Sequence, residues 1–135
     1  MARPVIMSVD DDPQVLSAIE RDLSRHYKRD YRVVKAGSPG EALDAARQLK
    51  QRGTAVALFL VDQRMPEMTG TKLLAEMQTL HPEARKVLLT AYADTDVAIE
   101  SINEIGLDHY LLKPWDPPEQ KLYPVLDDLD RKSVV

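Results

Sequence analysis

The chain has 135 residues, which is enough for one domain with a sizeable core. Its hydrophobic content of 44% and its net charge of −4 are ordinary for a globular protein and argue against a surface built to bind nucleic acid. The absence of cysteine excludes disulfides and zinc–thiolate sites, and no apolar run reaches the ~20 residues of a membrane span. The segment Met1–Pro4 lacks the apolar stretch of a signal peptide, so we expect a single cytoplasmic domain over residues 1–135.

Five short apolar runs predict β-strands near residues 5–9, 31–36, 56–61, 86–90 and 108–112. The first, third and fourth runs are nearly continuous in apolar residues, which is typical of strands covered on both faces. The second run alternates with charged residues and suits the edge of a sheet.

Segments with apolar residues three and four apart lie between these runs and predict helices. They are Val15–Leu23 after Pro13, Ala42–Leu49 after Ser38, Leu73–Leu80 before His81, and Val97–Ile105 before Gly106. A fifth helix after Asp116 is less regular, because Pro124 cannot donate a hydrogen bond to an upstream carbonyl. There we expect either a kink or a late start near Lys121.

Alternating strands and helices predict a doubly wound α/β fold, in which helices cover both faces of a five-stranded parallel sheet. In such folds ligands bind beyond the carboxyl ends of the strands. Asp10, Asp11 and Asp12 follow the first predicted strand, Asp62 follows the third and Lys113 follows the fifth. Carboxylates this close need a cation between them, so the pattern predicts a hard-cation site that contains a reactive carboxylate.

The chain resembles the receiver domain of two-component response regulators over essentially its whole length. The matching segments are residues 9–13 (Val-Asp-Asp-Asp-Pro), 62–70 (Asp-Gln-Arg-Met-Pro-Glu-Met-Thr-Gly), 88–91 (Leu-Leu-Thr-Ala) and 110–114 (Tyr-Leu-Leu-Lys-Pro). The resemblance implies a flavodoxin-like sheet with strand order 2-1-3-4-5. It also implies that Asp62 accepts a phosphoryl group from a phosphohistidine of a sensor histidine kinase or phosphotransfer protein. Such a domain is not an enzyme acting on a separate substrate, because it catalyses only its own phosphorylation and dephosphorylation.

Magnesium is the cofactor that this resemblance and the carboxylates imply. Asp10, Asp11 and Asp62 are the expected metal ligands, with Asp11 the more direct and Asp10 acting partly through water. The resemblance adds the backbone carbonyl of Arg64. Asp12 precedes a proline, and we interpret it as the cap of the following helix, with a metal contact as the alternative.

Three further residues complete the predicted switch. Lys113 and Thr90 would bind the phosphoryl oxygens, and Thr90 would move toward Asp62 when Asp62 is modified. Tyr110 would swing inward in response, although an aromatic residue in a strand is also ordinary packing. The resemblance further implies a cis peptide between Lys113 and Pro114.

Arg64 and Tyr92 stand two residues after Asp62 and Thr90, respectively. In receivers these positions tune hydrolysis of the aspartyl phosphate. A guanidinium and a phenol could contact the phosphate or block the attacking water. We therefore predict slow autodephosphorylation.

The resemblance to receivers also implies an output surface that spans the fourth helix, fifth strand and fifth helix. It comprises residues 94–105, Tyr110, Trp115 and residues 117–129, and it is also where a homodimer would form. Trp115 is either a lid over the core or an interface anchor. Residues 113–126 resemble receivers fused to thioredoxin-reductase-like flavoproteins, so the chain is either a stand-alone receiver or part of a longer protein. No contact with nucleic acid or membrane is expected.

Three other interpretations of the sequence conflict with the residues present. A pseudo-receiver that serves only for interaction or dimerisation would lack an acid, the threonine or the lysine, and all are present. A flavodoxin-like enzyme would need a phosphate-binding loop after the first strand, where three aspartates would repel phosphate. A haloacid-dehalogenase-type phosphatase would carry a threonine that residues 10–13 lack.

Overall fold

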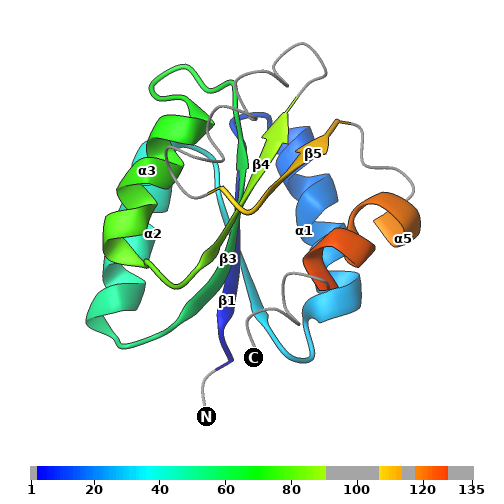
Figure 1. Ribbon diagram of the computed structural model, residues 1–135, viewed down its shortest axis with the longest axis horizontal. Coiled ribbons are helices and arrows are strands. Elements are labelled where there is room, and N and C mark those ends of the chain that lie inside the picture. Colours follow the sequence, from blue (N-terminus) through cyan, green and yellow to red (C-terminus); the bar gives the residue numbers. More distant parts are fainter. Residues whose placement is uncertain (1–2, 91–106, 114–117, 128–135) are drawn as a thin grey trace.

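A five-stranded parallel sheet forms the centre of the computed structural model, which describes residues 3–90, 107–113 and 118–127 (Figure 1). The strand order is β2-β1-β3-β4-β5, as predicted. The strands are β1 (Val5–Val9), β2 (Arg32–Ala36), β3 (Val56–Asp62), β4 (Arg85–Thr90) and β5 (His109–Leu112). Each strand begins and ends within one residue of its predicted range.

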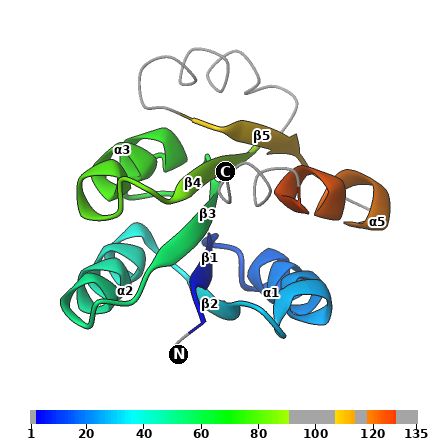
Figure 2. The ribbon, with the colours of Figure 1, turned by 60° about the horizontal axis from the view of Figure 1, so that its bottom comes forward.

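Helices cover both faces of the sheet (Figure 2). On one face lie α1 (Pro13–Tyr27) and α5 (Pro118–Lys121). Helix α1 and the residues that follow α5 pack with the strands through a cluster that includes Ile6, Leu60 and Val87. On the other lie α2 (Pro39–Gln51) and α3 (Gly70–Leu80). The predicted helix at Val97–Ile105 lies outside the described residues.

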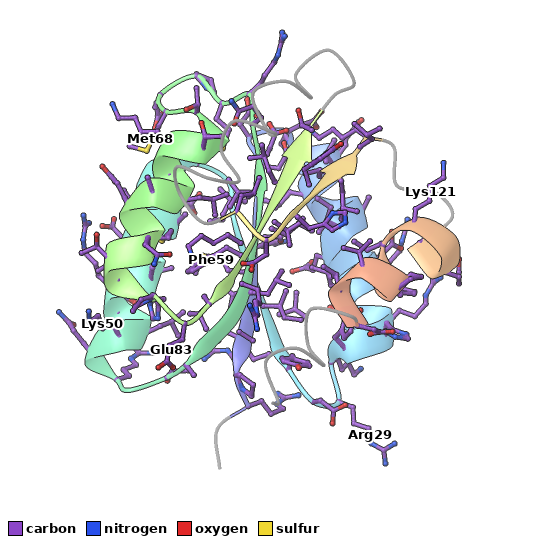
Figure 3. The ribbon with its side chains drawn as sticks, viewed as in Figure 1. Arg29, Lys50, Phe59, Met68, Glu83 and Lys121 are labelled. Carbon is purple, nitrogen blue, oxygen red and sulfur yellow. The ribbon has the colours of Figure 1, made fainter. Side chains whose placement is uncertain are left out.

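The central strand positions are buried on both sides, as their continuous apolar runs predicted. Phe59 on β3 is fully buried in the middle of the molecule, whereas Lys50 and Glu83 point outward (Figure 3). Strand β2 lies at the edge of the sheet and exposes Arg32 and Lys35. The edge position predicted from its charged, alternating pattern is therefore confirmed.

The helix starts follow from their capping residues. The Asp12 carboxylate accepts a hydrogen bond from the backbone N–H of Gln14 (2.9 Å) and caps α1, with Pro13 in the first turn. The capping interpretation of Asp12 is thus confirmed. Ser38 caps α2 by accepting from the N–H of Glu41 (3.2 Å).

The end of the described chain is kinked. Helix α5 begins at Pro118, residue 122 forms a turn, and residues 123–127 are helical again. Of the two expectations for this segment the kink is confirmed and the late start near Lys121 is wrong, because Pro118 is accepted in the first turn of a helix. The Tyr123 hydroxyl donates to the backbone carbonyl of Asp22 (2.7 Å) and ties this end to α1.

Among the helices of residues 3–90 and 118–127, none combines the length and the apolar run that crossing a lipid bilayer requires.

Candidate functional site

Three carboxylates meet at the carboxyl ends of β1 and β3, at the top of the sheet in Figure 1. Asp10 and Asp11 come directly after β1, and Asp62 is the last residue of β3. A carboxylate oxygen from each of the three lies within 4.8 Å of the others. The sequence predicted that these side chains converge, and the structure brings them together.

Lys113 joins two of these carboxylates. Its Nζ lies 2.7 Å from Asp62 Oδ1 and 3.1 Å from Asp10 Oδ2. The backbone N–H of Lys113 donates to the carbonyl of Thr90 (3.0 Å), which holds the start of the lysine against the end of β4. One cation from beyond β5 therefore connects the ends of β1 and β3.

Asp10 and Asp11 have different surroundings. Asp10 is 1% exposed, and both of its carboxylate oxygens accept hydrogen bonds, Oδ1 from the Asp12 N–H (2.9 Å) and Oδ2 from Lys113. Asp11 is exposed to solvent. Because Asp10 is already engaged by protein donors, Asp11 is the more accessible oxygen donor of the pair.

The charges at this site are unbalanced, with three carboxylates around one ammonium. Burial raises the pKa of Asp62, the charges of Asp10 and Asp11 raise it further, and the hydrogen bond and charge of Lys113 only partly offset them. Burial lowers the pKa of Lys113, but its hydrogen bonds and ion pairs with Asp62 and Asp10 outweigh that effect and raise the pKa above its ordinary value. The excess of negative charge contributes to the increase of both pKa values, because the lysine faces several anions whereas the carboxylates share one cation.

The donor set fits a magnesium ion. Mg²⁺ prefers oxygen ligands and keeps several of its water molecules, so it needs few protein contacts and access to solvent. The carboxylates line an open pocket together with Asp12, Gln63, Arg64 and Lys113. Asp10, Asp11 and Asp62 can therefore hold such an ion, and the exposed Arg64 stands at the same pocket.

The junction between β3 and α3 is unusually close. A Cβ atom added at Gly70 would lie 2.3 Å from the backbone oxygen of Asp62, so only glycine fits there. The N–H of Gly70 donates to the Gln63 carbonyl (3.0 Å), and the N–H of Thr71 donates to Gln63 Oε1 (3.0 Å). In the sequence, Gln63 and Gly70 stand out only as parts of a segment that matches receivers, and no role was predicted for either residue.

Thr90 and Tyr110 occupy the positions expected of them on β4 and β5. Thr90 ends β4 and is 1% exposed, beside Leu89, which pairs with Asp62 in the sheet. Tyr110 is half-buried and packs against the core on the α2 and α3 face. Their switching roles stay predictions. Tyr92, Trp115 and the peptide to Pro114 lie outside the described residues.

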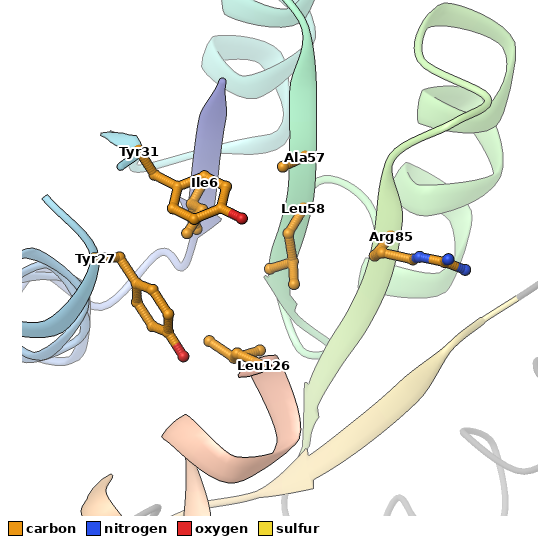
Figure 4. A pocket seen from close by; sticks show the side chains of 7 residues that line it. All are labelled: Ile6, Tyr27, Tyr31, Ala57, Leu58, Arg85 and Leu126. Carbon is orange, nitrogen blue, oxygen red and sulfur yellow. The ribbon is translucent and has the colours of Figure 1, made fainter. Parts of the chain in front are cut away.

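A second pocket lies at the opposite, amino-terminal edge of the sheet (Figure 4). Its lining is mainly apolar and aromatic and consists of Ile6, Tyr27, Tyr31, Ala57, Leu58, Arg85 and Leu126. The Tyr27 hydroxyl is already bonded to Asp127 Oδ1 (2.9 Å). With no carboxylate among its lining residues, this pocket lacks the chemistry of the acidic one.

Comparison with known proteins agrees with this geometry. A family model described as the response regulator receiver domain matches residues 6–122. The chain is 35% identical over 112 residues to the hydrogenase transcriptional regulatory protein HoxA of Cupriavidus necator, covering 83% of this chain and 21% of that protein. It is 33% identical over 128 residues to the transcriptional regulatory protein GlrR of Escherichia coli, covering 95% of this chain and 26% of that protein. The chain thus spans about a quarter or less of these relatives.

Solved structures show the same architecture. The signal receiver domain of an HD domain-containing protein from Pseudomonas fluorescens superimposes with a TM-score of 0.80 at 30% identity, covering 98% of each chain. A CheY-like response regulator receiver domain protein from Methanospirillum hungatei gives a TM-score of 0.78 at 28% identity, again covering 98% of each chain.

Proposed function

The chain belongs to the receiver domain family of two-component response regulators, and we propose that it acts as a switch that is set by phosphorylation of Asp62. The observation that carries the proposal is the contact of Lys113 with Asp62 (2.7 Å) inside a cluster of three carboxylates. That arrangement combines a nucleophile, a cation-binding set and a fixed positive charge. Membership of the family implies a histidine kinase as the phosphoryl donor.

Asp62 would act as the nucleophile. A carboxylate oxygen forms the bond to phosphorus while the bond from phosphorus to the kinase histidine nitrogen breaks, and the imidazole leaves with that electron pair. Asp62 must be ionised for this attack. Because burial raises the pKa of Asp62, neighbouring positive charges such as that of Lys113 are needed to favour the ionised carboxylate at neutral pH.

The cation-binding set would be Asp10, Asp11 and Asp62 with the backbone carbonyl of Arg64. Mg²⁺ bound there would supply positive charge against the oxygens of the phosphoryl group. Lys113 would donate to a phosphoryl oxygen, because its ammonium already lies beside the attacking carboxylate. The Thr90 hydroxyl would donate to another oxygen from the end of β4.

Three wider statements belong to the same proposal. Residues 1–135 would form one receiver domain, supported by a family match over residues 6–122 that extends from β1 past β5. Signal output would use the surface of residues 94–105, Tyr110, Trp115 and 117–129, much of which lies outside the described residues. Arg64 and Tyr92 would slow hydrolysis of the aspartyl phosphate.

The protein attached to this domain would be a transcriptional regulator, because the relatives described above carry that name and are several times longer. A fusion to a thioredoxin-reductase-like flavoprotein, suggested by residues 113–126, stays a second prediction. Dimerisation through the output surface also stays a prediction.

Incubation with acetyl phosphate and Mg²⁺, followed by intact-protein mass spectrometry, tests the proposal. We expect the mass of one phosphoryl group to be added, and we expect no addition when Mg²⁺ is chelated beforehand. Asp62→Asn should abolish the addition. Asp12→Asn is the matched control in the same pocket and should retain it, because asparagine also caps helices well.

The result also separates the alternatives. A pseudo-receiver would gain no phosphoryl group under any of these conditions. Loss of phosphorylation in Asp12→Asn with normal folding would restore the metal-contact interpretation of Asp12. Phosphorylation that persists in Asp62→Asn would overturn the assignment of the nucleophile.

A further inference from the structure

We propose that Gln63 is a positioning residue for the phosphorylation site, fastening the segment that carries Asp62 and the Arg64 carbonyl to the first turn of α3. The inference rests on the proposed function. It adds a role for a residue that would otherwise be only the neighbour of the nucleophile.

Gln63 is held by three hydrogen bonds to two different elements. Its backbone N–H donates to the Leu89 carbonyl on β4 (3.1 Å), and its backbone carbonyl accepts from the Gly70 N–H (3.0 Å). Its side-chain Oε1 accepts from the Thr71 N–H (3.0 Å). The residue is 7% exposed, so these bonds are largely shielded from water.

The side-chain bond meets a need of the helix. The first N–H groups of a helix have no partner within it. In α3 the cap residue Thr69 satisfies one of them by accepting from the Lys72 N–H (3.3 Å). Gln63 satisfies another from outside the helix, reaching back from the end of β3. Because the Thr71 N–H can only donate, the amide atom of Gln63 that faces it must be the oxygen and not the NH₂ group.

The hydrogen bond from the Thr71 N–H to Gln63 matters for the site because the end of β3 and the start of α3 are in direct contact. The Gly70 backbone approaches Asp62 so closely that no Cβ fits between them. Gln63 and Arg64 both line the acidic pocket. Any movement of the start of α3 relative to residue 63 therefore moves the backbone on which the nucleophile and the Arg64 carbonyl are placed. Phosphoryl transfer depends strongly on such placement.

Two variants separate positioning from simple helix capping. Gln63→Met keeps the length of the side chain and removes the acceptor for the Thr71 N–H. Thr69→Ala removes the other side-chain acceptor at the same helix end. Mg²⁺ affinity of the intact chain is measured by isothermal titration calorimetry, the rate of phosphorylation by acetyl phosphate by mass spectrometry, and folding by thermal unfolding without metal.

We expect both variants to lower the melting temperature, since each leaves one N–H of α3 without its partner. Only Gln63→Met should also weaken Mg²⁺ binding, by about tenfold, as is typical when a residue that supports metal ligands is lost. Its phosphorylation should slow in proportion at subsaturating Mg²⁺. Gln63→Leu is the second variant if Gln63→Met folds poorly.

Two outcomes overturn the inference. One is wild-type Mg²⁺ affinity and phosphorylation rate in a folded Gln63→Met or Gln63→Leu protein. The other is an equal loss of Mg²⁺ affinity in Thr69→Ala, which would assign the effect to general loosening of α3. Failure of the proposed function looks different, because then the wild-type chain itself gains no phosphoryl group.

Discussion

Lys113 Nζ is closer to Asp62 Oδ1, at 2.7 Å, than to Asp10 Oδ2, at 3.1 Å. The lysine therefore bridges the nucleophile and a carboxylate of the cation-binding set. Both carboxylates are more deeply buried than the lysine, whose side chain is 28% exposed. Among the ion pairs of the described residues, those of the Lys113 ammonium directly join the two buried carboxylates.

Replacement of Lys113 by methionine should affect metal binding and phosphorylation in opposite directions. Mg²⁺ and the ammonium would occupy one pocket and repel each other, so Lys113→Met should bind Mg²⁺ more tightly, by about three- to tenfold. Phosphorylation by acetyl phosphate should nevertheless slow by at least about tenfold, because a donor to the phosphoryl oxygens is lost.

Calorimetric titration and mass spectrometry measure these two effects. Lys50→Met, which removes an exposed lysine on α2, is the control and should change neither. Weaker Mg²⁺ binding in Lys113→Met would show that the lysine organises the carboxylates rather than competing for them.

Asp62 should make the metal-free protein less stable at neutral pH than at acid pH. Burial raises its pKa, so the folded state binds this proton more tightly than the unfolded state, in which the pKa is near 3.8. The contribution of Asp62 to stability is therefore full below that value and is lost as the pH rises through the raised pKa.

Asp62→Asn removes the ionised carboxylate and should raise the melting temperature at pH 7 by a few degrees, on the order of 1 kcal/mol. The melting curves of the two proteins should converge toward about pH 3, where Asp62 is protonated in both states. Thermal unfolding in chelator across this range is the measurement. A variant that is less stable than wild type at pH 7 would mean that the ion pair with Lys113 outweighs the burial of the charge.

Gly70 should tolerate no side chain. In Gly70→Ala the new Cβ would meet the backbone oxygen of Asp62 at 2.3 Å and the Leu88 side chain at 2.9 Å. We expect a loss of about 2–4 kcal/mol in the free energy of unfolding, because backbone must move to make room. Gly40→Ala is the matched control, since its Cβ would meet nothing closer than 4.0 Å in the first turn of α2.

Urea unfolding measures both glycine variants. Gly40→Ala should be neutral or more stable than wild type by up to about 1 kcal/mol, since alanine loses less chain entropy in a helix. Equal destabilisation of the two would indicate that the contact at Gly70 relaxes at little cost.

Ser8 should be replaceable by alanine with a gain in stability. Its side chain on β1 is fully buried, and Oγ has no hydrogen-bond partner within the part of the chain that the structure describes. A buried hydroxyl without a partner costs about 1–3 kcal/mol, so Ser8→Ala should raise the free energy of unfolding by about 1 kcal/mol. Phosphorylation should be unchanged. A clear loss of stability in urea unfolding would indicate that Oγ is hydrogen-bonded in solution, for instance to a buried water molecule.

The framework of this site could be predicted from the sequence because a local pattern marks each strand that carries it. Continuous apolar runs mark β1, β3 and β4, and parallel strands bring their carboxyl ends to one edge. That edge necessarily gathers Asp10, Asp62 and Lys113. The cap at Asp12 followed from its place before Pro13, and the edge position of β2 from its charges.

Other features could not be predicted, because they depend on the path of the backbone through loops. The unequal burial of Asp10 and Asp11 follows from a turn in which the Asp12 N–H binds Asp10. The contact between Gln63 and Thr71 spans eight positions and exists only because α3 begins beside the end of β3. No periodic pattern in the sequence indicates a contact of this kind between a loop residue and the start of the next helix. For residues 118–127 the sequence pattern left two alternatives, a kink or a late helix start, and the start of α5 at Pro118 with a turn at Leu122 decides between them.

The close approach of Gly70 to Asp62 bears on how this site could be transplanted into another protein. Three acidic residues and a lysine at the strand ends of a designed sheet would reproduce the charges but not the support of the nucleophile. The smallest transferable unit is the continuous segment from Asp62 to Thr71, because its glycine lets strand and helix touch and its glutamine closes the loop between them. A designer would therefore graft a backbone segment first and place the remaining charges around it.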